Sequence, residues 1–177
     1  MFVNFSVYDF KLTYPDDWNV LINDRLITPR NGNITFMSPE GFNINLTWRP
    51  LREVKRKYPT VNESADHMID YMGKKRVVKS LRIVNRENIS LLGHESILDS
   101  LELLEEVGGT LWIPGPKVLN ECMVFQVYCE ETDLFFIIFS EPTRKEEWKL
   151  RKVGKFKEYD ENAETFHNVV KSFRCHN

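Results

Sequence analysis

Apolar and polar residues alternate along the first fifty residues, which is the pattern of half-buried β-strands. Phe10, Leu12 and Tyr14 fall on one side of an extended segment, and the residues between them are polar or charged. The same alternation recurs over residues 18–22, 34–36 and 42–48, with turn-forming residues between these segments. The Asn31-Gly32 dipeptide predicts one of the hairpin turns. Short turns between successive strands indicate an antiparallel sheet.

The hydrophobic period changes to that of a helix after Thr60. Thr60 and Glu63 have the spacing of a capping box, in which each side chain accepts a hydrogen bond from the other residue's backbone amide. Apolar residues then recur at helical spacing, at Val61, Ala65, Met68, Ile69 and Met72. We therefore expect an amphipathic helix that packs against the sheet and ends or kinks at Gly73.

Strand patterns resume in the second half of the chain, over residues 83–91, 95–104, 123–129 and 134–139. Residues 134–139 are apolar on both faces, which is typical of a central strand covered on both sides. The mixed-charge segment 141–158 predicts a partial helix around residues 145–152. A final helix is expected from a cap at Asp160, with an apolar stripe of Ala163, Phe166, Val169, Val170 and Phe173.

These elements predict an α+β fold with a central, mostly antiparallel sheet covered by helices. No linker or repeat divides the sequence, and 177 residues suit one core, so we expect a single domain over residues 1–177.

Composition limits the classes of partner. The net charge is −2, which argues against a dedicated nucleic-acid-binding protein, because such proteins usually carry a basic excess. The longest apolar run, residues 134–139, is far shorter than the roughly twenty residues that span a bilayer. Residues 1–7 lack the features of a signal peptide. We therefore expect a soluble, cytoplasmic protein, or an exported one if a leader has been removed.

Five Asn-X-Ser/Thr sequons favour the exported alternative, because five exceeds what random placement would give. They begin at Asn4, Asn33, Asn45, Asn62 and Asn88. However, Asn, Ser and Thr are also ordinary residues of turns and strands.

The residues that most often carry chemistry are scattered. Cys122 and Cys129 are seven residues apart on one predicted strand, so their side chains should lie on opposite faces and cannot form a disulfide. The four histidines show no metal-binding spacing, and Cys175-His176 is expected to be a frayed tail. No nucleophile or phosphate-loop motif is present. We therefore expect no metal, no cofactor and no catalytic residues.

Two regions are candidates for binding a partner. The first is a basic group formed by Arg49, Arg52, Lys55, Arg56 and Lys57, which otherwise is simply a solvated face. The second is Trp112 and Ile113, in a connection rich in glycine and proline. Apolar aromatics in such a loop either anchor an interface or fold back on their own sheet.

Several short motifs, in order along nearly the whole chain, resemble those of one superfamily. They are Phe10-Lys-Leu-Thr-Tyr-Pro-Asp-Asp-Trp18, Leu92-Gly-His-Glu95 and the closing Phe166-x-x-Val-Val-x-Ser-Phe173. In this order they resemble the PsbP-like domains, a superfamily that includes photosystem extrinsic proteins and Ran-binding Mog proteins. The resemblance implies an α/β/α sandwich, a binding or assembly role, and no shared catalytic residues. Two departures are the unusually basic segment 49–59 and the long connection 106–121.

The leading hypothesis is a non-enzymatic binding or assembly module whose ligand or protein partner is unknown. The alternative is a small hydrolase or transferase whose site assembles only in space. A deep pocket that joins a serine or cysteine to a histidine within hydrogen-bonding reach would favour the enzyme.

Overall fold

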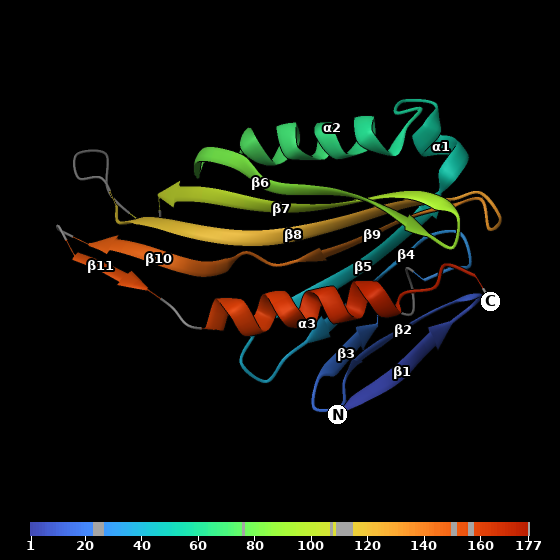
Figure 1. Cartoon of the computed structure of the whole chain (residues 1–177), viewed down its shortest axis with the longest axis horizontal. Coiled ribbons are helices and arrows are strands. Elements are labelled where there is room, and N and C mark those ends of the chain that lie inside the picture. Colours follow the sequence, from blue (N-terminus) through green and yellow to red (C-terminus); the bar gives the residue numbers. More distant parts are fainter. Residues whose placement is uncertain are drawn as a thin grey trace.

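The computed structural model describes residues 1–22, 27–75, 77–106, 108, 115–149, 152–155 and 158–176. A mainly antiparallel sheet dominates this part of the chain (Figure 1). Its strands are β3 (Asn19–Ile22), β4 (Gly32–Met37), β5 (Asn43–Pro50), β6 (Val78–Leu91), β7 (His94–Glu106), β8 (Lys117–Cys129), β9 (Leu134–Ser140), β10 (Thr143–Lys149) and β11 (Lys152–Lys155). The order across the sheet is β6–β7–β8–β9–β5–β4–β3, with β10 and β11 beside the first half of β8.

Strand β9 is central, as its sequence predicts. It pairs with β5 on one side and with β8 on the other. Phe135 and Phe136 are adjacent, point to opposite faces, and are both buried. The strand is therefore covered from both sides, which explains why its sequence is apolar without alternation.

The two faces of the sheet are covered differently (Figure 1). Helix α1 (Leu51–Lys55) and helix α2 (Val61–Gly73) pack on one face, with α2 against β6, β7 and β8. Helix α3 (Glu158–Ser172) lies on the other face, together with a separate hairpin of β1 (Phe2–Val7) and β2 (Phe10–Pro15). The core on the α3 face contains Phe10, Phe36, Trp48, Phe136 and Phe166, all nearly inaccessible to solvent.

Helix α2 confirms the predicted capping box. The Thr60 side chain accepts a hydrogen bond from the Glu63 amide, and the Glu63 carboxylate accepts one from the Thr60 amide. The helix ends at Gly73, as expected. None of the helices in the described part of the chain is long and apolar enough to cross a membrane.

The prediction of a partial helix around residues 145–152 is wrong. Strands β10 and β11 form an antiparallel hairpin there, and β10 also pairs with residues Lys117–Glu121 of β8. Strand β8 is longer than the predicted 123–129, and β9 covers only its second half. The first half of β8 therefore offers free backbone groups to β10, and this pairing outweighs the helical preference of a Lys/Glu-rich segment.

The final helix confirms its apolar stripe, with Phe166, Val169 and Val170 buried, but it begins at Glu158 rather than at Asp160. The residues that follow it are not a frayed tail. Arg174 forms a β-bridge with Lys11, with backbone hydrogen bonds of 2.9 and 2.8 Å. The segment after α3 is thus fixed to β2 at Arg174.

The hairpin predicted from Asn31 and Gly32 is present, since β3 pairs with β4, but Gly32 is not in a turn: it is the first residue of β4 and lies opposite Trp48 in β5. A Cβ atom at position 32 would overlap the Trp48 indole ring. Trp48 is fully buried, and its Nε1 donates a hydrogen bond to the Thr28 carbonyl oxygen at 3.0 Å. The ring therefore has little freedom to move aside. Gly32 provides space for the indole rather than a turn conformation.

We expect Gly32→Ala to lower the free energy of unfolding by about 1–3 kcal/mol, the usual cost of overpacking a core. Urea denaturation followed by circular dichroism measures this. Gly73→Ala is the matched control, because nothing lies within 4 Å of a Cβ atom there and alanine favours a helix. Equal stability of the Gly32→Ala protein and the wild type would contradict the described packing of Trp48.

Candidate functional site

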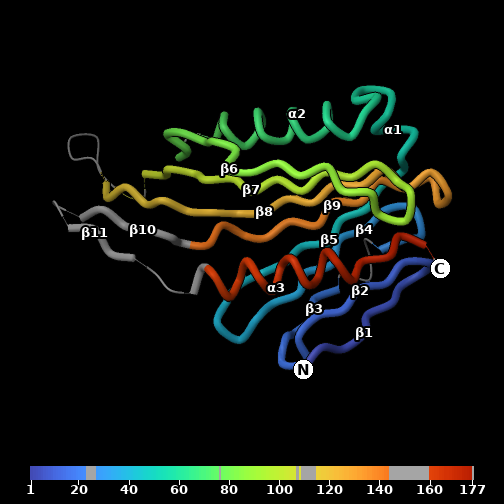
Figure 2. Tube along the Cα trace, viewed as in Figure 1, coloured from blue at the N-terminus to red at the C-terminus, as the bar shows by residue number. Residues whose placement is uncertain are grey.

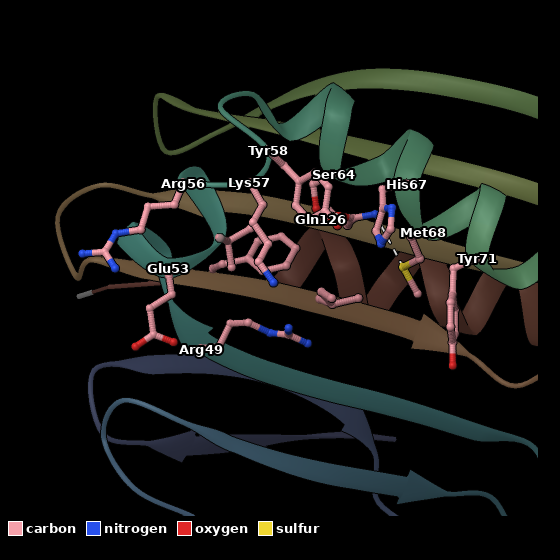
Figure 3. Close-up of a pocket in the computed structure, with 13 residues that line it drawn as sticks. Arg49, Glu53, Arg56, Lys57, Tyr58, Ser64, His67, Met68, Tyr71 and Gln126 are labelled. Carbon is pink, nitrogen blue, oxygen red and sulfur yellow. Dashed lines mark hydrogen bonds between the residues drawn. The ribbon is translucent and has the colours of Figure 1, made fainter.

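A groove with a volume of about 770 Å³ lies between α1, α2 and the sheet (Figure 3). Helix α2 covers β6, β7 and β8, so the face of β9 beyond them is only partly covered. The groove is lined by Arg49, Glu53, Val54, Arg56, Lys57, Tyr58, Ser64, His67, Met68, Tyr71, Gln126, Phe135 and Ile137. These residues come from the end of β5, both helices, the segment between the helices, β8 and β9.

The floor of the groove is mainly apolar. Phe135 and Ile137 face it because they are two residues apart on β9. Gln126 is buried on the neighbouring strand; its Oε1 accepts a hydrogen bond from the Ser64 hydroxyl at 2.8 Å. Its amide nitrogen contacts the Met68 sulfur at 3.6 Å. The buried Gln126 side chain thus connects α2 to the sheet.

The wall formed by the segment between α1 and α2 is held in place by aromatic contacts. The Tyr58 ring stacks on the His67 imidazole, with the ring centroids 4.6 Å apart. The Tyr128 hydroxyl donates a hydrogen bond to the Tyr58 carbonyl oxygen at 2.8 Å. Tyr71, further along α2, is 64% exposed. The groove therefore has a fixed wall and an accessible aromatic ring at its edge.

The structure divides the predicted basic group into two sets. Arg52 and Lys55 point toward the β8–β9 turn, where Arg52 lies 4.0 Å from the Asp133 carboxylate and Lys55 pairs with Glu130. The other three, Arg49, Arg56 and Lys57, line the groove and form no ion pair with any described residue. Figure 3 shows Arg49 and Lys57 extending over the opening, whereas the Arg56 guanidinium points away from them.

The second predicted region, Trp112 and Ile113, lies outside the described residues. Its role in binding stays a prediction.

A second cluster was not predicted, because its members are far apart in the sequence. His94, Cys129, Cys175 and His176 bring four potential ligand atoms within 4.8 Å of one another. His94 Nε2 lies 3.1 Å from His176 Nε2 and 3.6 Å from Cys129 Sγ. The Cys175-His176 dipeptide was the available signal, but only the backbone bridge at Arg174 brings it to the sheet.

Cysteine chemistry differs between the two faces of β8. Cys122 lies in the core under α2 and Cys129 in the core under α3, which confirms that the two point to opposite faces. Burial raises the pKa of the Cys122 thiol to about 12. A hydrogen bond from Cys175 lowers the pKa of the Cys129 thiol to about 5, although burial opposes this effect. Cys129 therefore favours the thiolate, and the pKa of Cys175 is raised.

The arrangement expected of an enzyme joins a serine or cysteine to a histidine in an open pocket. Cys129 and His94 are within contact distance, but Cys129 has no solvent-exposed surface. In the groove, the Ser64 hydroxyl donates to Gln126, and the His67 ring stacks on Tyr58. His94 lines a small pocket together with Ser90 and Ser96, but Cys129 does not line this pocket, and the Ser96 hydroxyl donates its hydrogen bond to the Ile89 carbonyl oxygen.

Two solved structures share the fold over nearly the whole chain. The solution structure of cyanobacterial PsbP from Synechocystis sp. PCC 6803 matches 98% of this chain and 91% of its own, with a TM-score of 0.60 and 13% identity. A mutant of the protein Mog1 matches 100% of this chain and 97% of its own, with a TM-score of 0.57 and 9% identity. No family model matches the sequence, and no curated protein does. The fold resemblance predicted from the motifs is thus confirmed.

Proposed function

We propose that this protein is a non-enzymatic binding module, acting as one domain of the PsbP-like α/β/α sandwich class. Its groove holds a segment of a partner protein that carries acidic side chains beside apolar ones. The observation that carries this proposal is the division of the basic residues. Two of the five are paired with carboxylates at the β8–β9 turn, and three line the groove without an ion pair among the described residues.

The shape of the groove supports an occupant of limited size. A volume of about 770 Å³ is within the range of roughly 300–1,000 Å³ that is typical of small-ligand sites, and it accommodates several side chains of a peptide. Val54, Phe135 and Ile137 provide apolar surface, which favours aliphatic or aromatic side chains of the occupant.

Charge supports an acidic occupant. The chain carries a net charge of −2, so the cations at the groove contrast with the rest of the molecule. Among the described residues that line the groove, Glu53 is the single acidic one. Arginine and lysine at the edge of an apolar groove attract carboxylates and fix the orientation of the bound segment. The binding or assembly role implied by the family resemblance agrees with this arrangement.

The experiment is a selection from a display library of random 12-residue peptides, followed by affinity measurement by fluorescence anisotropy. We expect enriched peptides to combine Asp or Glu with aliphatic or aromatic residues. The Arg49→Glu/Lys57→Glu double variant should bind them at least about tenfold more weakly, equivalent to about 1.4 kcal/mol. Binding should also weaken as salt is raised, because the cations are exposed.

Arg52→Glu/Lys55→Glu is the matched control. It makes the same change in net charge, but at two residues of α1 that point toward Asp133 and Glu130. We expect less than a twofold effect on peptide affinity. If the two double variants lost peptide affinity equally, the binding would be a non-specific electrostatic effect, and the proposal would be overturned. The proposal would also be overturned if the selection enriched no peptide.

A further inference from the structure

We propose that His94, Cys129, Cys175 and His176 form a closed, tetrahedral binding site for a zinc-like divalent metal ion. This cluster lies at one end of the sheet, on the α3 side, whereas the groove lies on the α2 side. The two proposals therefore stand on separate residues. Failure of one would leave the other unaffected.

Three segments bring the ligands together. His94 follows the tight β6–β7 turn, in which Leu92 and Gly93 both have positive φ. Cys129 ends β8. Ser96 of β7 lies opposite Val127 of β8, so the same register two residues further along places His94 opposite Cys129. Cys175 and His176 follow the bridge between Arg174 and Lys11. Figure 2 shows the C-terminal tail at the same end of the sheet as the β6–β7 and β8–β9 turns.

The separations agree with those around a tetrahedral metal ion. Bonds of about 2.3 Å to sulfur and about 2.0–2.1 Å to nitrogen place neighbouring ligand atoms about 3.3–3.8 Å apart. The two Nε2 atoms are 3.1 Å apart, and the distance from Cys129 Sγ to His94 Nε2 is 3.6 Å. All four ligand atoms lie within 4.8 Å of one another. Only small side-chain adjustments are needed to bind an ion.

A neighbouring carboxylate orients one of the ligands. The Glu131 carboxylate lies 3.1 Å from His176 Nδ1, which leaves Nε2 of this ring for the metal. Metal binding would release the thiol protons of Cys129 and Cys175 to solvent and leave two thiolates and two neutral imidazoles around the ion.

Four protein ligands leave no open position for a substrate or a water molecule, so the site is structural rather than catalytic. Two sulfur and two nitrogen donors in a tetrahedron favour zinc over magnesium or calcium, which prefer oxygen ligands. The ion would join the C-terminal tail to the β6–β7 hairpin and to the end of β8. We therefore expect it to stabilise this end of the molecule.

The experiment is a titration of the reduced, chelator-treated full chain with Co²⁺, followed by competition with Zn²⁺. We expect one ion per chain, with the visible and near-ultraviolet absorption of tetrahedral cobalt bound to thiolates, and displacement by zinc. Cys175→Ser and His176→Gln should each weaken binding by about 100-fold, as expected for loss of one of four ligands. Glu131→Gln should weaken it by about tenfold, because His176 loses its orienting carboxylate.

Cys122→Ser and His67→Gln are the controls, since these residues lie on the other face of the sheet, and each should change the affinity less than twofold. Circular dichroism without metal tests whether each variant folds. His176→Gln, in the partly exposed tail, keeps the test decisive if a cysteine variant does not fold. The proposal is overturned if the reduced wild type binds no ion, whether or not Cys129 and Cys175 form a disulfide when oxidised. It is also overturned if the control variants lose as much affinity as the ligand variants.

Discussion

Replacing Arg86 with methionine is expected to lower the free energy of unfolding by about 3–5 kcal/mol, the usual cost of removing one partner of a buried ion pair. Arg86 and Asp99 face each other across β6 and β7. The guanidinium donates two hydrogen bonds to the Asp99 carboxylate, at 2.6 and 3.0 Å, and these raise the pKa of Arg86. Asp99 is only 1% exposed, so the variant would leave an uncompensated buried charge.

Urea denaturation of the wild type and the variant measures the effect. Arg86→Met/Asp99→Leu should recover most of the lost stability, because the double change removes both charges. Lys79→Met is the control, since Lys79 pairs at 3.3 Å with the more accessible Glu106 and should contribute less than about 1 kcal/mol. A loss below about 1 kcal/mol for Arg86→Met would show that Asp99 is not buried as described.

The second large effect is expected at Phe173, immediately after α3. Its fully buried ring contacts the rings of Phe136 and Phe10, with centroids 5.2 and 6.4 Å apart. Phe173→Ala should lower the free energy of unfolding by about 3–5 kcal/mol, because it removes buried surface and leaves a cavity. Denaturation in the presence of a chelator measures the packing effect apart from any bound metal.

Tyr71→Ala is the matched control for Phe173→Ala. Tyr71 is likewise aromatic and lies in α2, but it is 64% exposed, and we expect a change within about 0.5 kcal/mol. If Phe173→Ala destabilised the protein no more than Tyr71→Ala does, helix α3 could not dock on the sheet in the way described.

Much of the fold follows from local patterns in the sequence. Alternation predicted β3, β4 and β5, and the Thr60–Glu63 capping box predicted the start of α2, but the alternating residues 2–14 form two strands rather than one. Local patterns were insufficient where long-range pairing decides the structure. Residues 143–149 form a strand because β8 offers a free edge, and Gly32 is required because Trp48 lies opposite it. Both causes are far away in the sequence.

The candidate sites were less predictable than the fold. The basic segment was recognised, but helix α1 was not. The sequence therefore could not show which basic side chains face the groove and which face the β8–β9 turn. Helix α1 directs Arg52 and Lys55 toward the β8–β9 turn, whereas Lys57, in the segment after the helix, lines the groove. The His94, Cys129, Cys175 and His176 cluster lacks any short spacing, since it assembles from three distant segments.

The bridge between Lys11 and Arg174 has a consequence for how the protein folds. The hairpin of β1 and β2 packs against α3, and the Thr13 amide donates a hydrogen bond to the Ser172 hydroxyl at 2.8 Å. During synthesis, this hairpin emerges long before residues 158–174, which cover part of its apolar side. Contacts between such distant parts of a chain slow folding, because the long loop must close first. We therefore expect this face of the core to close late in folding, and its aromatic residues stay exposed to chaperones and to other nascent chains until it closes.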